Sequence, residues 1–62
     1  MNWKIIKDEF PPLWKDVLFY HPSKGYLASE AGTWSDTDKI LVPWWNGENT
    51  PIEEFEKWIL ID

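Results

Sequence analysis

Residues 16–20 read DVLFY, residues 21–25 read HPSKG, and residues 26–30 read YLASE. In an extended chain, Val17 and Phe19 fall on one face while apolar residues also occupy the other, which is typical of a central strand. The HPSKG segment combines Pro, Ser and Gly, residue types that favour turns. The sequence therefore predicts an antiparallel hairpin of two strands, and the fold builds outward from it.

Pro and Gly divide the rest of the chain into short pieces, which favours a β-rich meander. Residues 3–6 (WKII) predict a first strand, and a tight turn at 31–32 leads into another short extended piece at 33–35. Residues 39–44 (KILVPW) predict a further strand, with Ile40, Val42 and Trp44 on one face and Leu41 on the other. Pro43 lacks the amide hydrogen that a ladder needs, so it ends that strand or places it at a sheet edge.

The C-terminal part predicts the one helix of the fold. Residues 50–53 (TPIE) match a helix start, with Thr50 as N-cap and the Glu closing a capping box. The following segment, 57–61, fits either a strand or a continued helix, and its strand-forming residues favour a final strand. The expected class is mainly β (small α+β): an antiparallel β-meander of four to five short strands with one short helix near residues 51–56, in a single domain over 1–62.

Large aromatic side chains must supply most of the stability, because the chain has 62 residues, six Trp and no Cys. A domain of this size buries only about 60% of the surface that its unfolded chain exposes. The lack of Cys fits a reducing compartment, and no apolar run suggests a signal peptide or a membrane helix. We therefore expect a cytoplasmic protein with no membrane partner.

The net charge of −5 is concentrated at the C-terminal end, where residues 46–62 carry five carboxylates and a single Lys. Arg is absent, so the chain lacks the planar group that binds phosphate or guanine with two hydrogen bonds. An acidic protein also repels the nucleic-acid backbone. No direct nucleic-acid partner is expected.

Residues with catalytic or metal-binding potential lack partners at a recognisable spacing. His21, the single His, is interpreted as a turn residue, and the pair Asp36 and Asp38 lacks the other ligands of a calcium loop. The paired carboxylates at 8–9 do not converge on one substrate atom. The chain has no Cys, and no Ser has an evident base. The sequence predicts a non-enzymatic protein without cofactor or metal.

Adjacent Trp44 and Trp45 are the strongest candidates for a binding surface, because neighbouring residues on a strand point to opposite faces. One of them is then exposed, and exposed Trp is a preferred contact for protein partners. The alternative is that the sheet covers one ring and the helix the other. Trp14, in a predicted loop, is either a lid over the core or an outward contact. The candidate partner-binding residues are Trp44, Trp45, Glu48, Glu53, Glu54, Glu56 and Trp14, whereas Trp3, Trp34 and Trp58 are predicted core residues.

Several short motifs together resemble a known family. They are Trp3, Ile5, Asp8, Phe10-Pro11, the run from Val17 to Tyr20, Gly32-x-Trp34 and the terminal Lys57-Trp58-Ile59-Leu60. This set is similar to the phage and prophage domain-of-unknown-function family five-five-one. The resemblance implies a small antiparallel β domain of phage origin and no established activity. Lys57 stands where the family has His, and residues 59–62 replace its Met-Pro-Leu-Pro, so roles tied to those positions do not carry over.

The leading hypothesis is a small phage-encoded interaction protein that binds and modulates a host bacterial protein in the cytoplasm of the infected cell. One alternative is a module that binds a sugar, peptide or nucleotide through exposed Trp and Tyr rings. A second is an acidic nucleic-acid mimic that blocks a DNA-binding protein. A homodimer is also possible if an edge strand near Val42 pairs with a second copy.

Overall fold

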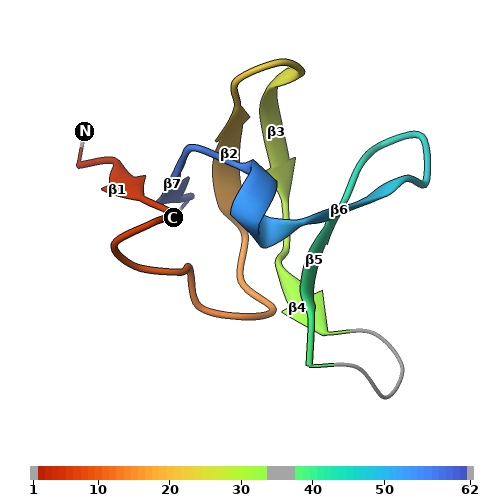
Figure 1. Ribbon diagram of the computed structural model, residues 1–62, viewed down its shortest axis with the longest axis horizontal. Helices are drawn as coiled ribbons and strands as arrows, with labels where there is room; N and C mark the ends of the chain where they lie inside the picture. Colours follow the sequence, from red (N-terminus) through yellow and green to blue (C-terminus); the bar gives the residue numbers. More distant parts are fainter. Residues whose placement is uncertain (1, 34–37, 62) are drawn as a thin grey trace.

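The computed structural model describes residues 2–33 and 38–61, which form two antiparallel β-sheets and a short 3₁₀ turn (Figure 1). One sheet has the order β1-β7-β2-β3 and the other the order β4-β5-β6. The predicted mainly β class is confirmed. The elements are β1 (Lys4–Ile5), β2 (Val17–His21), β3 (Gly25–Ser29), β4 (Gly32–Thr33), β5 (Ile40–Pro43), β6 (Asn49–Pro51), η1 (Ile52–Glu54) and β7 (Lys57–Leu60).

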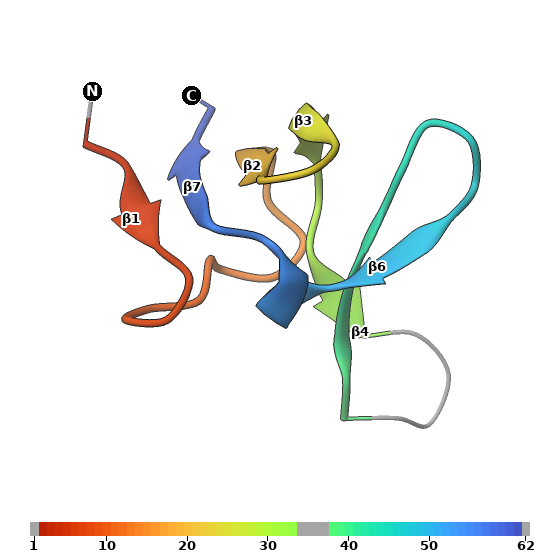
Figure 2. The same ribbon diagram turned by 45° about the horizontal axis from the view of Figure 1, so that its top comes forward.

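The strand order differs from a simple meander. The last strand, β7, returns between β1 and β2, so that Trp58 lies opposite Lys4 on one side and Phe19 on the other (Figure 2). This position buries Trp58 almost completely. The strands are also shorter and more numerous than the four to five predicted. β1 and β4 have two residues each and β6 has three, which is too short to produce a recognisable alternation.

The central hairpin and the final strand agree with the prediction. β2 and β3 pair from Val17 opposite Ser29 to His21 opposite Gly25. Along β2, alternate side chains are fully buried while Leu18 and Tyr20 are half-buried. β2 therefore lies inside the sheet, between β7 and β3, as its apolar residues on both faces predict.

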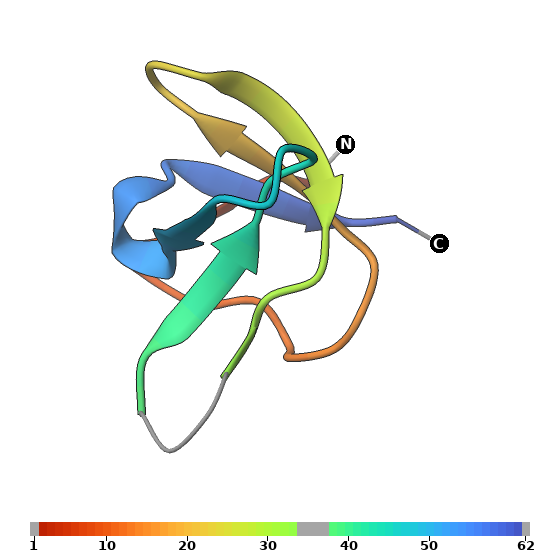
Figure 3. The same cartoon turned by 90° about the vertical axis from the view of Figure 1, so that its right-hand side faces the viewer.

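The core fills the space between the two sheets. Figure 3 shows β5 running obliquely to β7 and β3, and the side chains of Val42 and Ile52 join those of the larger sheet in one cluster. Trp58 belongs to this cluster, as predicted, whereas the prediction for Trp34 falls outside the described residues. The full cluster comprises Ile6, Val17, Phe19, Leu27, Ala31, Val42, Ile52, Phe55 and Trp58.

The predicted core position of Trp3 is wrong. Its ring is half-buried and packs against Tyr26, with ring centroids 6.0 Å apart. Tyr26 in turn packs against Tyr20 on the next strand. The Lys57 ammonium lies 5.1 Å from the Trp3 ring and 5.3 Å from the Tyr20 ring. These four side chains lie outside the core cluster. We term them the outer aromatic face: Trp3, Tyr20, Tyr26 and Lys57.

The predicted helix is reduced to one turn, and its expected cap is wrong. η1 is a 3₁₀ turn whose N-cap is Pro51, with no capping hydrogen bond from a side chain. Thr50 is instead the buried middle residue of β6, and its hydroxyl accepts a hydrogen bond from Trp44 Nε1 at 2.7 Å. A buried indole N–H needs an acceptor, and this requirement outweighs the local capping preference of Thr50.

The expected edge strand near Val42 is also wrong. β5 is the middle strand of its sheet, with β4 on one side and β6 on the other, and Val42 is fully buried. Pro43 is the last residue of β5, which agrees with its predicted role in ending the strand. The strand that the homodimer hypothesis placed at a sheet edge is therefore an inner strand.

Trp14 is exposed, and its ring packs against the backbone of Gly32. The backbone N–H of Trp14 donates a hydrogen bond of 2.8 Å to the Ala31 carbonyl. The backbone of Trp14 has a φ of 63°, an unusual value for a bulky residue. The six-membered part of its ring lies against the Cα of Gly32, where any Cβ would overlap it. The side chain is still 53% exposed. Gly32 therefore leaves the space that the Trp14 ring occupies.

This close contact leads to the first testable expectation. Gly32→Ala should lower the free energy of unfolding by about 1–3 kcal/mol, because the added methyl group displaces the Trp14 ring. Denaturant unfolding measures the change. In a Trp14→Ala background the same substitution should cost much less, since the overlapping ring is gone. An equal cost in both backgrounds would contradict the packing described.

Candidate interaction site

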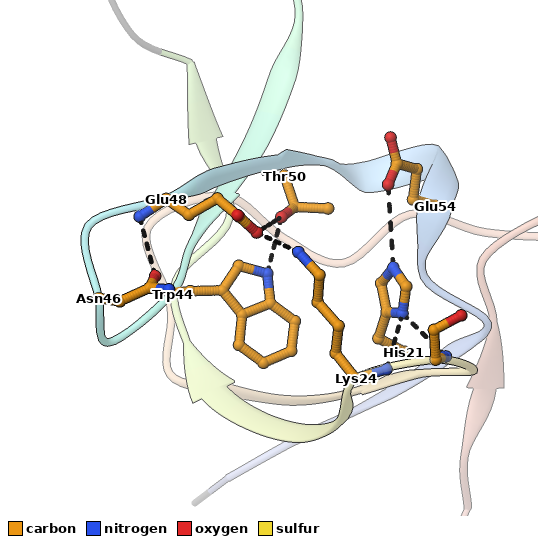
Figure 4. A network of polar contacts seen from close by, with 8 residues as sticks. His21, Lys24, Trp44, Asn46, Glu48, Thr50 and Glu54 are labelled. Carbon is orange, nitrogen blue, oxygen red and sulfur yellow. Dashed lines mark hydrogen bonds and ion pairs between the residues drawn. The ribbon is translucent and has the colours of Figure 1, made fainter.

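A cleft of about 320 Å³ lies where the β2–β3 turn meets the β5–β6 hairpin (Figure 4). Its lining residues, which we term the Trp44–Trp45 corner, are Lys24, Trp44, Trp45, Asn46 and Glu48. Lys24 comes from the first hairpin and the other four come from the second. The corner therefore depends on the packing of two segments that lie far apart in the sequence.

The local sequence of the second hairpin explains how the two indoles are placed. The Gly47 N–H donates to the Trp44 carbonyl at 2.9 Å, and the Trp44 N–H donates to the Glu48 carbonyl at 2.7 Å. Gly47 has a φ of 87°, which a residue with a side chain rarely adopts. The Asn46 side chain accepts a hydrogen bond from the Glu48 N–H at 3.1 Å. Trp44 and Trp45 thus follow the end of β5 and lie in a turn, not on a strand as predicted.

Trp44 is the anchored member of the pair. Its indole N–H donates to the buried Thr50 hydroxyl, and its ring stacks on Phe55 with centroids 5.9 Å apart and planes at 16°. The ring edge also meets His21 at 6.1 Å. These contacts join Trp44 to the core, so its position is set by the fold.

Trp45 is the exposed member of the pair. Its side chain is 77% exposed, the largest value among the large apolar side chains of the described residues. The two indoles are nearly perpendicular, at 89°, with centroids 6.1 Å apart. The prediction that one of the two rings is outside is confirmed, and the alternative that both are covered is wrong.

Lys24 and Glu48 provide the charged part of the corner. Their side chains form an ion pair, and the Lys24 ammonium also lies 5.2 Å from the centroid of the Trp44 ring. The pKa of Glu48 is lowered from its ordinary value of 4.5, mainly because Lys24 donates a hydrogen bond to the carboxylate and attracts its charge. The Thr50 hydroxyl, 3.5 Å from the same carboxylate, contributes in the same direction.

The depressed pKa sets the direction of a pH effect. Because the folded-state pKa of Glu48 is lower than 4.5, the ion pair contributes stability above that pH and loses it as the pH falls through the folded-state value. We expect Lys24→Met to raise the pKa of Glu48 toward 4.5. Carboxyl chemical shifts followed by NMR during an acid titration measure this. An unchanged pKa would show that Lys24 does not contact Glu48 in solution.

His21 holds the turn that carries Lys24. Its Nδ1 accepts hydrogen bonds from the backbone N–H groups of Ser23, at 3.0 Å, and Lys24, at 3.2 Å. Its Nε2 has no hydrogen-bond partner and lies 3.8 Å from a Glu54 carboxylate oxygen. The ring is buried edge-on against Phe55. The sequence interpretation of His21 as a turn residue is correct, and the structure adds that its side chain organises that turn.

Replacing His21 tests this role. His21→Ala should lower the free energy of unfolding by about 2–3 kcal/mol, since it leaves a cavity beside Phe55 and removes the acceptor of two N–H groups. His21→Asn should recover part of that loss, because an Asn side chain can accept from the same N–H groups. Thermal unfolding compares the variants. Equal losses for Ala and Asn would mean that the ring contacts alone account for the effect.

The structure brings together only part of the predicted site. Trp44, Trp45 and Glu48 line the same cleft, and Glu54 approaches it through His21. Glu53 and Glu56 are exposed but are not among the lining residues of the cleft. Lys24 was missed, because its contact with Glu48 joins residues 24 positions apart and leaves no local pattern in the sequence.

Trp14 belongs to a different location. The Trp44–Trp45 corner lies at the turn of the β2–β3 hairpin, next to Lys24. Trp14 lies near the other end of this hairpin, where Val17 pairs with Ser29. There a groove of about 550 Å³ is lined by Trp14, Asp16, Ala28, Ser29, Glu30, Pro43 and Ile61. The candidate binding residues therefore lie at two separate places on the fold.

Two further observations concern residues 2–33 and 38–61. They contain no group of three or more His, Asp or Glu side chains arranged to hold a metal ion, and no helix with the length and apolar character needed to cross a bilayer. Comparison of the whole chain with protein-family models, with curated proteins and with solved structures finds no match. The site must therefore be interpreted from its own geometry.

Proposed function

We propose that this chain is a small, non-catalytic interaction protein that binds another protein through the Trp44–Trp45 corner. The observation that carries the proposal is the contrast between the two indoles. Trp44 is anchored by Thr50 and Phe55, whereas Trp45 is presented to solvent beside it. Trp is enriched among the residues that contribute most of the binding energy in protein interfaces, and here an exposed Trp lies beside a cleft.

The charge of the chain supports a basic partner surface. The net charge is −5, and Glu48 at the cleft is joined on the same side of the fold by Glu54 near His21. Opposite charge on the partner would increase the association rate and restrict the choice of partner. We therefore propose a partner whose contact surface carries Lys or Arg side chains.

The resemblance to phage family five-five-one supports a more specific version of the proposal. On that basis the chain is phage-encoded and its partner is a host bacterial protein, which it binds and modulates in the cytoplasm of the infected cell. Affinity capture from a bacterial lysate tests this version. Wild-type protein should recover a host protein that Trp45→Ala fails to recover, while Tyr26→Ala, which alters an exposed aromatic residue on the outer aromatic face, should behave like the wild type.

A second candidate function rests on the groove beside Trp14. Its volume of about 550 Å³ falls within the ~300–1,000 Å³ range of small-molecule sites, and one wall is an indole ring. A small-ligand module would show saturable changes in Trp fluorescence on titration with sugars, peptides or nucleotides. The response should then disappear in Trp14→Ala and persist in Trp45→Ala, which separates this candidate from the first.

A further inference from the structure

The Trp44–Trp45 corner already holds a positively charged group, supplied by the protein itself. The ammonium of Lys24 lies between the face of Trp44 and the carboxylate of Glu48 (Figure 4). An aromatic face combined with a carboxylate is the environment that stabilises an alkylammonium ion, through the ring quadrupole and direct charge pairing. The position of Lys24 shows which chemistry this corner accommodates.

Trp45 contributes a second wall that Lys24 does not use. Its ring stands at 89° to that of Trp44, both residues line the cleft, and Trp45 remains 77% exposed. The amide of Asn46 lines the same cleft. The site therefore has more aromatic surface and more polar groups than the single internal ammonium covers.

We propose that the corner is a receptor for a lysine side chain of a partner protein, and that Lys24 is an internal occupant which the incoming lysine displaces. This inference rests on the proposed function and defines its chemistry. The incoming ammonium pairs with Glu48, and its alkyl chain lies against Trp44 and Trp45. The released Lys24 side chain extends into solvent from its turn.

Displacement is feasible because the ion pair that holds the Lys24 ammonium is partly exposed. The Lys24 side chain is 40% exposed and that of Glu48 is 50% exposed, and ion pairs at such positions are weakened by solvent and salt. The backbone of the turn is fixed independently by His21, which accepts the Lys24 N–H. Release of the ammonium therefore leaves the hairpin unchanged.

Glu48 also explains why the corner selects a cation despite the presence of Lys24. The carboxylate is ionised at neutral pH, since even its ordinary pKa of 4.5 lies well below 7 and Lys24 lowers it further, and a second carboxylate, Glu54, lies near the same end of the fold. An incoming anion would have to separate Lys24 from Glu48 and would then face the unpaired carboxylate. An incoming ammonium keeps the Glu48 carboxylate paired, and the released Lys24 ammonium is hydrated by solvent.

The test uses two blocked peptides, acetyl-Gly-Lys-Gly-amide and acetyl-Gly-norleucine-Gly-amide, which differ in the terminal ammonium. Binding to the full chain is followed by NMR through the indole N–H signal of Trp45, identified by its absence in Trp45→Ala. The Lys peptide should shift this signal in a saturable manner, and the norleucine peptide should not. Lys24→Met, which keeps the side-chain length and removes the charge, should bind the Lys peptide about 3- to 10-fold more tightly, because the internal competitor is gone.

Glu48→Gln tests the carboxylate that should pair with the ammonium of the Lys peptide. It should abolish the response to the Lys peptide while leaving the thermal unfolding midpoint within a few degrees of the wild type. Equal responses to the two peptides, or weaker binding by Lys24→Met, would overturn the inference. Capture of a host protein that depends on Trp45 but is indifferent to Lys24→Met and Glu48→Gln would retain the proposed function and reject the lysine receptor. If the Lys peptide binds as expected but no captured protein depends on Trp45, the lysine receptor would be retained and the proposed binding of a host protein rejected.

Discussion

Trp58→Ala should leave a large fraction of the chain unfolded at 25 °C. Trp58 lies between β1 and β2 at the centre of the larger sheet and is 4% exposed. Its indole N–H also donates to the Glu9 carbonyl at 2.9 Å, which fixes the N-terminal loop against the C-terminal strand. Removing a buried Trp costs about 3–5 kcal/mol, and a core of this size rarely supplies more than about 3–5 kcal/mol in total.

The comparison with Trp58→Phe separates packing from hydrogen bonding. Phe keeps most of the ring volume but cannot donate to Glu9, so it should recover more than half of the stability lost in Trp58→Ala. Far-ultraviolet circular dichroism and denaturant unfolding at 25 °C measure both variants. A Trp58→Ala chain that unfolds as cooperatively as the wild type, with a change below about 1 kcal/mol, would contradict the central position assigned to β7.

Trp45→Ala should have the opposite profile, with a large loss of binding and little change in stability. Because its ring is mostly exposed, the free energy of unfolding should change by less than about 0.5 kcal/mol. Truncating a Trp at the centre of an interface reduces the binding free energy by about 2 kcal/mol or more, which corresponds to a ~30-fold larger dissociation constant. Calorimetric titration of the captured partner measures this difference.

Trp44→Ala is the informative contrast, because the two residues are adjacent and chemically identical. Trp44 stacks on Phe55 and donates to Thr50, so its truncation should reduce stability by about 3 kcal/mol or more. A binding loss in Trp44→Ala then accompanies loss of structure, whereas the loss in Trp45→Ala does not. Equal effects of the two substitutions on stability would contradict the division of roles between the rings.

The features of the fold that follow from local pattern were predictable. The β2–β3 hairpin combines apolar residues on both faces of one strand with a Pro- and Gly-containing turn, and both signals agree. The position of β7 between β1 and β2 was not predictable, because pairing of the two chain ends leaves no local signature. The helix prediction over residues 51–56 failed because Thr50 meets the indole of Trp44, a contact that depends on tertiary packing.

The candidate site shows the same division. The dipeptide Trp44-Trp45 and the turn at Asn46-Gly47 identify an exposed indole from sequence, even though the residues lie in a turn and not in a strand. Lys24 becomes part of the site only through the packing of two hairpins. Trp14 separates from the site because the hairpin places it at the opposite end.

The most direct test of the account is to map the contact surface by NMR with the captured partner bound. The account predicts that the indole N–H signal of Trp45 and the backbone signals of residues 44–48 shift or broaden, while the indole signal of Trp3, on the outer aromatic face, stays unchanged. Changes at Trp3 and Tyr26 with no change at Trp45 would contradict it and would place the interface on the outer aromatic face.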